Sequence, residues 1–145
     1  MPAVNFSVSA NSENPTKVVV ETPGGFKITV DEPENLGGTN DGPNPVEYVL
    51  AALAGCLNVV GHMVAKEMGI EMRDLSFKLN GDLDPAKFTG QSEEGRAGYQ
   101  AINVEIEADC DADEETLAKW VEAVEERCPV SDNLANETPV KITVK

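Results

Sequence analysis

The sequence is poor in the residues that build metal centres and disulfide frameworks. It has one histidine, His62, and three cysteines, with no Cys-x-x-Cys pair, which argues against a zinc site. The cysteine count is odd, and the first residues carry neither a basic stretch nor a continuous apolar segment, so no secretion signal or structural disulfide framework is expected. We therefore expect reduced thiols, a cytoplasmic protein and no metal or organic cofactor.

Basic residues are also scarce. The chain has 11 Lys and Arg against 26 Asp and Glu, a formal net charge of −15. Binding to a phosphate backbone requires Lys and Arg to neutralise it, so nucleic acid is not an expected partner, and an anionic membrane surface is disfavoured. No glycine-rich phosphate loop and no Gly-x-Ser-x-Gly motif occurs.

An uninterrupted apolar run of membrane-spanning length is missing as well. The longest apolar stretch, 46–65, is interrupted by Glu47, Asn58 and His62. Polar residues inside such a stretch favour a buried helix of a soluble protein over a membrane span.

What the sequence does contain begins with short alternating runs that predict β-strands. Every second residue in these runs is β-branched or aromatic, and "PGG" at 23–25 is a turn signal that joins the last two as a hairpin. The three predicted strands cover residues 3–10, 16–22 and 25–31. A Gly/Pro/Asn-rich segment at 31–45 follows, and it is long enough to be a functional loop.

A long helix and further alternating runs make up the rest. The helix is predicted from Pro45 to about Met68, with Gly69 as its stop signal. The later elements are a strand at 71–84, a loop at 85–98, a strand at 99–109, a helix at 111–127 capped by Asp111 or Asp113, and a strand at 139–145. This order, βββ-α-ββ-α-β, predicts a single α+β domain over residues 1–145.

The predicted helix is apolar almost all the way round between Tyr48 and Ala65. A helix of this kind must be covered on several sides, and a domain of 145 residues has few elements for that. We therefore expect a second subunit to supply part of the cover.

The cysteines lie in distinct surroundings. Cys56, in "AALAGC", has small neighbours that leave room beside the sulfur, although a cysteine in an apolar helix is more often packing than catalysis. Cys128, in "ERCPVSDNL", stands where Pro129 must end a helix, and the negative end of the helix dipole there raises a thiol pKa, which suits a second nucleophile rather than a first. Cys110 is flanked by acidic residues and is expected to be unreactive.

The two cysteine motifs together resemble the OsmC/Ohr family of osmotically inducible and organic hydroperoxide resistance proteins. In "GPNPVEYVLAALAGC", Pro45, Glu47 and the Ala-Gly-Cys that ends at Cys56 match the family pattern. The downstream Cys-Pro-Val-Ser at 128–131 matches its second motif. The order of elements agrees with that fold over nearly the whole chain.

The resemblance implies a thiol peroxidase that acts on organic hydroperoxides. Cys56 would be the peroxidatic residue, whose thiolate attacks the distal peroxide oxygen and becomes a sulfenic acid. Cys128 would resolve it as an intramolecular disulfide, which an external dithiol then reduces. The family fold further implies antiparallel sheets packed around a long central helix in an intertwined homodimer with its active sites at the interface.

The family also uses an N-terminal Arg, held by a Glu, to lower the pKa of the peroxidatic thiol, and here the chain departs from the pattern. Its three arginines are Arg73, Arg96 and Arg127, so residues 1–72 contain none. Lys17 and Lys27 lie in the strands where this charge is expected, but Lys lacks the bidentate fork of Arg. Arg96, in the glycine-flanked "EEGRAG", is the predicted substitute; the alternative is a solvated loop residue.

Glu47 also has two interpretations. It precedes Cys56 by nine residues, which places it about half a turn round and ~13 Å along a straight helix from the thiol. It would therefore act on the site through a bend near 51–54 or through a charge on a neighbouring element or subunit. Alternatively, it complements the helix dipole.

The missing N-terminal Arg keeps a second function open. Without activation a thiol is mostly protonated at neutral pH, so the chain could be an OsmC-like dimer that binds a small apolar ligand without turning over peroxide. His62 is expected to be a core or interface residue rather than a ligand or base.

Overall fold

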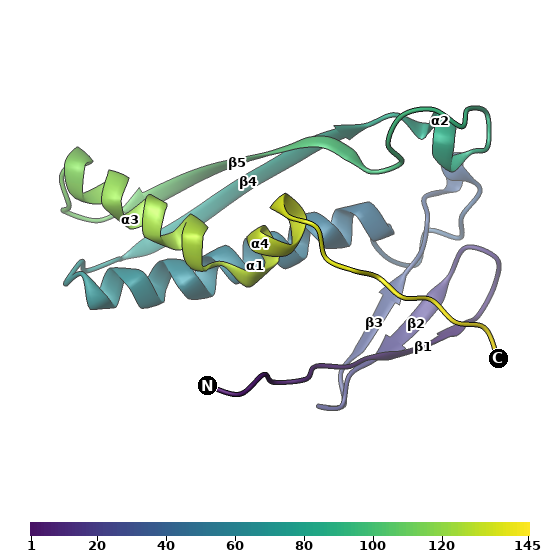
Figure 1. Ribbon diagram of the computed structural model, residues 1–145, viewed down its shortest axis with the longest axis horizontal. Helices are drawn as coiled ribbons and strands as arrows, with labels where there is room; N and C mark the ends of the chain where they lie inside the picture. The colour runs from purple at the N-terminus through teal and green to yellow at the C-terminus, as the bar shows by residue number, and fades with distance from the viewer. The chain divides into compact units, whose positions relative to one another are not determined.

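The computed structural model describes residues 1–145, which form two compact units, Met1–Ala51 and Ala52–Lys145 (Figure 1). The elements follow in the order β1 (Ser9–Ser12), β2 (Val18–Glu21), β3 (Lys27–Val30), the short 3₁₀ helix η1 (Glu34–Leu36), α1 (Pro45–Glu67), β4 (Asp74–Leu83), α2 (Pro85–Phe88), β5 (Tyr99–Asp109), α3 (Glu114–Arg127) and α4 (Pro129–Ala135). Small antiparallel sheets and a long helix confirm the predicted α+β class. The single domain over residues 1–145 stays a prediction.

The first unit is built on an antiparallel sheet in the order β1-β2-β3. The predicted hairpin is confirmed, because β2 pairs with β3 across the turn at 23–25, with Val18 opposite Val30. The predicted first strand, 3–10, is largely wrong. β2 ends at Glu21, which pairs with Ser9, so the apolar positions before Ser9 have no strand to pair with and are exposed.

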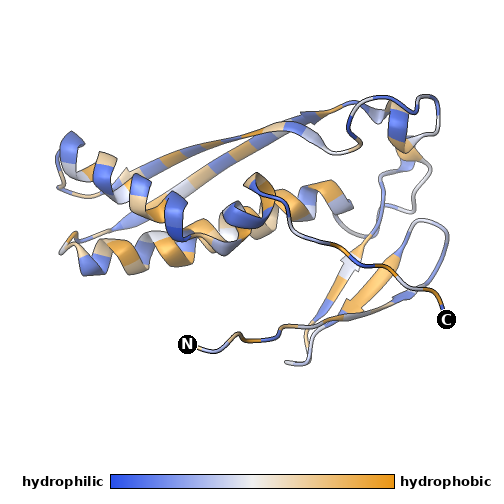
Figure 2. Ribbon diagram, viewed as in Figure 1, coloured by the Kyte–Doolittle hydropathy of each residue, from blue (hydrophilic) through white to orange (hydrophobic).

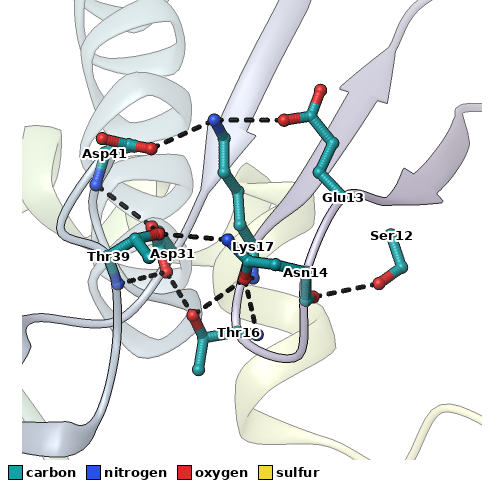
Figure 3. A network of polar contacts seen from close by, with 8 residues as sticks. All are labelled: Ser12, Glu13, Asn14, Thr16, Lys17, Asp31, Thr39 and Asp41. Carbon is teal, nitrogen blue, oxygen red and sulfur yellow. Dashed lines mark hydrogen bonds and ion pairs between the residues drawn. The ribbon is translucent and has the colours of Figure 1, made fainter.

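A buried carboxylate organises the loop that leads from β3 to α1. Asp31 has no exposed surface, and its carboxylate accepts hydrogen bonds from the hydroxyl groups of Thr16 (2.8 Å) and Thr39 and from the backbone N–H groups of Glu32 (2.7 Å) and Asp41 (3.1 Å) (Figure 3). Burial alone would raise the pKa of Asp31, but these hydrogen bonds outweigh it and hold the pKa well below its usual range. Nothing in the sequence pattern of the predicted loop indicates this arrangement.

Helix α1 begins and ends as its sequence predicts. At its start, the side chain of Asn44 accepts the N–H of Glu47 (2.9 Å) while Glu47 accepts the N–H of Asn44 (3.0 Å), a reciprocal capping box. At its end, Gly69 adopts φ = 72°, and the N–H of Ile70 bonds to the carbonyl of Ala65 (2.8 Å). A residue with a Cβ would be strained at that φ, so glycine stops the helix here.

In the second unit, the β4–β5 ribbon and helix α3 pack against one face of the C-terminal part of α1 (Figure 1). The ribbon runs from Asp74 opposite Asp109 to Leu83 opposite Tyr99, and its alternate apolar side chains face the core. The single tryptophan, Trp120, is buried and donates its indole N–H to the carbonyl of Gly61 (2.9 Å). The buried core consists of Leu53, Leu57, Val60, Val64, Ala65, Trp120, Val124 and Cys128.

Two predictions for the C-terminal half need correction or completion, and one further helix was not predicted. The predicted loop at 85–98 contains the short helix α2, and the predicted helix at 111–127 begins at Glu114, with Asp113 as the N-cap (Asp113 Oδ1 to Thr116 N, 2.8 Å). An additional helix, α4, follows α3 directly.

The predicted strand at 139–145 is wrong, so the final β of the predicted order is missing. Val140, Ile142 and Val144 alternate as a strand requires, but they are at least 79% exposed and pair with no other strand. Alternation makes a segment able to form a strand, whereas the strand itself needs a free sheet edge to pair with.

Helix α1 is long and apolar enough to cross a membrane by length and composition only. Its hydropathy colouring in Figure 2 shows the same apolar character. The core helix of a soluble protein meets the same criteria, and α1 contributes most of the buried residues of the hydrophobic core. Only 33% of its most apolar stretch is buried, so the prediction of a buried helix is confirmed for one face of α1 and not for the whole helix.

Candidate functional site

Cys56 lies in the middle of α1, at the edge of the core. Its thiol is free and half-buried, and it packs against the core cluster next to the buried residues Leu53 and Leu57. The preceding Gly55 is exposed, and a Cβ added there would meet no atom within 4 Å. The chain therefore leaves open space on one side of this stretch of α1.

Cys128 lies at the junction of α3 and α4 and has no exposed surface. It is the N-cap of α4: Pro129 occupies the first turn, and the Cys128 Sγ accepts the backbone N–H of Ser131 (3.5 Å). Sequence reasoning placed Cys128 at the end of one helix and missed that it also starts the next. A cap residue followed by Pro is a known helix-start signal and could have indicated α4.

Cys56 packs against the buried cluster that contains Cys128. Burial raises the pKa of the Cys128 thiol, the Ser131 N–H opposes this, and Cys56 raises the pKa further through a hydrogen bond and through charge repulsion. The expected direction for Cys128 is therefore confirmed, but its main cause is burial rather than the end of the α3 dipole. Segments 72 positions apart (128 − 56) thus bring two free thiols together.

Both thiols are held by the packing of α3 against α1. Trp120 and Val124 of α3 belong to the same buried cluster as Leu57 and Val60 of α1. One residue before Cys128, the Arg127 guanidinium forms two hydrogen bonds to the Glu67 carboxylate at the end of α1 (2.6 and 3.0 Å). This ion pair gives the end of α3 a fixed partner on α1.

The positive charges considered for activation of Cys56 have other partners. Arg96 is exposed and donates to the carbonyl of Tyr99 (3.5 Å), the first residue of β5. Arg73 holds the carboxylates of Asp109 (3.0 Å) and Asp111 (3.2 Å). In the first unit, Lys17 contacts Glu13 and Asp41 (both 3.1 Å) and Lys27 lies 3.8 Å from Glu21.

The structure also gives the surroundings of the other residues considered from the sequence, Glu47, His62 and Cys110. The Glu47 carboxylate forms the capping box of α1, which is the dipole-complementing arrangement that the sequence allowed; its action on the thiol stays a prediction. His62 is exposed on α1, so its expected place in the core is wrong and a place in an interface stays a prediction. Cys110 is half-buried between Asp109 and Asp111. No group of His, Cys, Asp and Glu side chains is arranged to hold a metal ion.

Comparison with known proteins gives one consistent result. The family model described as OsmC-like protein matches residues 38–143. An OsmC-like protein of Mycoplasma pneumoniae has a similar structure (TM-score 0.78, 21% identity, covering 91% of this chain and 88% of that one). No curated protein matches the chain.

Two further similar structures carry functional names. An organic hydroperoxide resistance protein of Legionella pneumophila has a TM-score of 0.64 and 21% identity, covering 92% of this chain and 91% of that one. An organic hydroperoxide resistance protein of Elizabethkingia anophelis has a TM-score of 0.65 and 19% identity, covering 90% and 88%. At these identities the structures show a shared fold. With the family model matching most of its length, and both cysteine motifs in place, the chain belongs to the OsmC-like protein family.

Proposed function

We propose that this protein is a thiol peroxidase that reduces organic hydroperoxides in the cytoplasm, with Cys56 as the peroxidatic and Cys128 as the resolving cysteine. The observation that carries the proposal is the pairing of two free thiols, from α1 and from the α3–α4 junction, in one core. Family members named as organic hydroperoxide resistance proteins support the substrate class.

The two thiols suit successive steps. The half-buried Cys56 thiolate attacks the distal oxygen of the hydroperoxide, the O–O bond breaks, an alcohol leaves, and Cys56 becomes a sulfenic acid. The Cys128 sulfur then attacks the Cys56 sulfur, water leaves, and a disulfide forms. A thiol buried with a raised pKa is a poor first nucleophile, which gives Cys56 the first role.

Two charged residues complete the proposed site. Arg96, on the loop between α2 and β5, would supply the positive charge that stabilises the Cys56 thiolate, exchanging its contact with the Tyr99 carbonyl for one with the sulfur. Glu47, at the start of α1, would orient an activating charge. Their substitution should slow the reaction with peroxide without changing which disulfide forms.

The test is formation of the Cys56–Cys128 disulfide by stoichiometric cumene hydroperoxide. We expect the disulfide in the wild type and in a Cys110→Ser control, and none in Cys56→Ser. In Cys128→Ser, dimedone should label Cys56 as a sulfenic acid. Both thiols staying free, at rates no better than those of cysteine in solution, would contradict the proposal.

The contacts of the arginines favour a second candidate, binding of a small apolar ligand without turnover. Arg73 and Arg127 form ion pairs with carboxylates, and Arg96 donates to a backbone carbonyl. Each guanidinium therefore has a partner other than Cys56. The pH dependence of Cys56 alkylation separates the candidates. A midpoint near that of a free thiol favours ligand binding, and a clearly lower one favours catalysis.

We also propose that the chain forms a homodimer through an exposed face of α1. Gly55, Val59 and Met63 recur every four residues on this helix, and Val59 and Met63 are 65% and 44% exposed. Large apolar side chains in such a row, beside open space at Gly55, fit a second copy of this helix.

Sedimentation of charged variants tests the dimer. Val59→Lys should shift the protein to a monomer, whereas Ala118→Lys, at an exposed position of α3, should leave the dimer intact. A wild type that sediments as a monomer at micromolar concentration, or a Val59→Lys variant that stays dimeric, would contradict this proposal.

A further inference from the structure

The two sulfurs of the proposed disulfide differ in how they meet solvent. Cys128 has no exposed surface and belongs to the buried cluster with Trp120 and Val124. Cys56 is half-buried at the edge of the same cluster. An external molecule can therefore approach one sulfur and not the other.

This difference matters for the step that regenerates the enzyme. A thiolate opens a disulfide by attacking one of its two sulfurs, and the other sulfur leaves. The attacker must approach the sulfur that it attacks from the side opposite the bond that breaks. Cys128 has no exposed surface and belongs to the buried cluster, so no side of its sulfur is open to an external attacker.

We propose that the external dithiol attacks Sγ of Cys56, so that Cys128 leaves and the mixed disulfide with the reductant is carried by Cys56 alone. This inference rests on the proposed function for the existence of the Cys56–Cys128 disulfide. It adds the direction in which that bond is opened and assigns Cys128 the role of leaving group.

The step balances as two exchanges. The first thiolate of the dithiol forms a bond to the Cys56 sulfur, and the Cys56–Cys128 bond breaks with its electron pair on Cys128, which takes up a proton. The second thiolate of the dithiol then attacks the reductant sulfur of the mixed disulfide. Cys56 leaves as a thiolate, and the dithiol is released as its own disulfide, oxidised by two electrons.

Two local features act on the leaving sulfur in opposite directions. Burial raises the pKa of Cys128, and a thiol of higher pKa leaves more slowly, by roughly a few-fold for each pKa unit. The backbone N–H of Ser131 already donates to this sulfur (3.5 Å) and stabilises the departing negative charge. The pKa changes only the rate at which Cys128 leaves, whereas the absence of exposed surface prevents an external thiolate from attacking its sulfur, so access decides the direction.

The raised pKa has a useful consequence after the bond has opened. Burial raises the pKa of Cys128 and so lowers the fraction of reactive thiolate, which slows its return to the mixed disulfide on Cys56. The second thiol of the reductant gains time to attack. A dithiol should therefore complete the reduction, whereas a monothiol should remain on Cys56.

The experiment uses the full chain with Cys110→Ser, in which the disulfide is made with diamide rather than peroxide. The oxidised protein is mixed with glutathione, quenched with acid, alkylated and analysed by peptide mass spectrometry. We expect glutathione on Cys56 and the alkyl group on Cys128, in at least tenfold excess over the reverse pattern. Glutathione on Cys128, or an even distribution, would overturn the proposal, as would failure of diamide to join the two cysteines.

A second measurement uses the reduced protein and depends on no disulfide. A bulky, charged disulfide reagent such as Ellman's reagent should modify Cys56 in the native protein and reach Cys128 only after unfolding. Equal native rates at the two cysteines would contradict the assigned direction. If diamide forms a bond that opens at Cys56 while cumene hydroperoxide forms none, the peroxidase proposal fails and the direction of opening stands.

Discussion

The packing that holds the cysteines together predicts a measurable loss of stability in Trp120→Phe. Trp120 fills the space between α3 and α1, where its indole N–H donates to the Gly61 carbonyl (2.9 Å). The fit is close: a Cβ added at Gly61 would come within 3.2 Å of the Trp120 ring and of Leu75. Phenylalanine keeps an aromatic ring but loses the hydrogen bond and part of the volume.

The magnitude follows from these two losses. A buried hydrogen bond contributes ~1 kcal/mol net to the free energy of unfolding. The smaller ring leaves a void beside Gly61 and Leu75, which costs about 1–2 kcal/mol for a substitution of this size. The sum, about 2–3 kcal/mol, corresponds to a fall of about 5–10 °C in the melting temperature of a chain of this length.

Urea unfolding followed by far-ultraviolet circular dichroism is the suitable assay, because the variant lacks the only tryptophan and its fluorescence. Tyr48→Phe is the matched control. It removes a hydrogen bond from the Tyr48 hydroxyl to the Thr29 carbonyl (2.7 Å) without changing the ring, so it should cost only about 1 kcal/mol. Equal losses in the two variants, or a loss below ~0.5 kcal/mol in Trp120→Phe, would refute the reasoning.

Three further predictions concern stability and local order. Gly69→Ala should cost about 1 kcal/mol in urea unfolding, because alanine is strained at φ = 72°, and an unchanged midpoint would contradict the stop signal. A hydrogen bond from Arg127 lowers the pKa of Glu67, so its stabilising contribution is full above the ordinary carboxyl pKa and is lost as the pH falls through the lowered one. Urea midpoints measured against pH should therefore fall less steeply toward acid in Glu67→Gln than in the wild type. Equal slopes in the two proteins would contradict a stabilising Glu67–Arg127 ion pair. Asp31→Ala should speed amide hydrogen exchange across residues 32–41, because the donors that bond to the carboxylate lose their acceptor, and unchanged protection would show that the loop does not depend on it.

Local signals in the sequence were sufficient for the bounds of several elements. The strict alternation at 99–109 predicted β5 to the residue, and Gly69 predicted the end of α1. These features depend on neighbours along the chain: side-chain period, a capping residue and a backbone angle that only glycine adopts easily. The family was also readable from the two cysteine motifs, and the family model confirms it.

The tertiary structure decided what depends on partners distant in sequence. The segment 139–145 has the pattern of a strand but no strand to pair with, and Ser9 rather than the residues before it meets the end of β2. The complete burial of Cys128, its contact with the Ser131 N–H and the carboxylate of Asp31 at the centre of a loop follow from packing between segments.

The sequence by itself determined which chemistry the chain can carry: two thiols in family motifs, few positive charges and a long apolar helix. Only the tertiary structure decided which thiol is enclosed and which remains accessible. The exposure of a thiol depends on side chains of other elements that pack over it, here those of α3 against α1. The residues next to a cysteine in the sequence do not determine this packing.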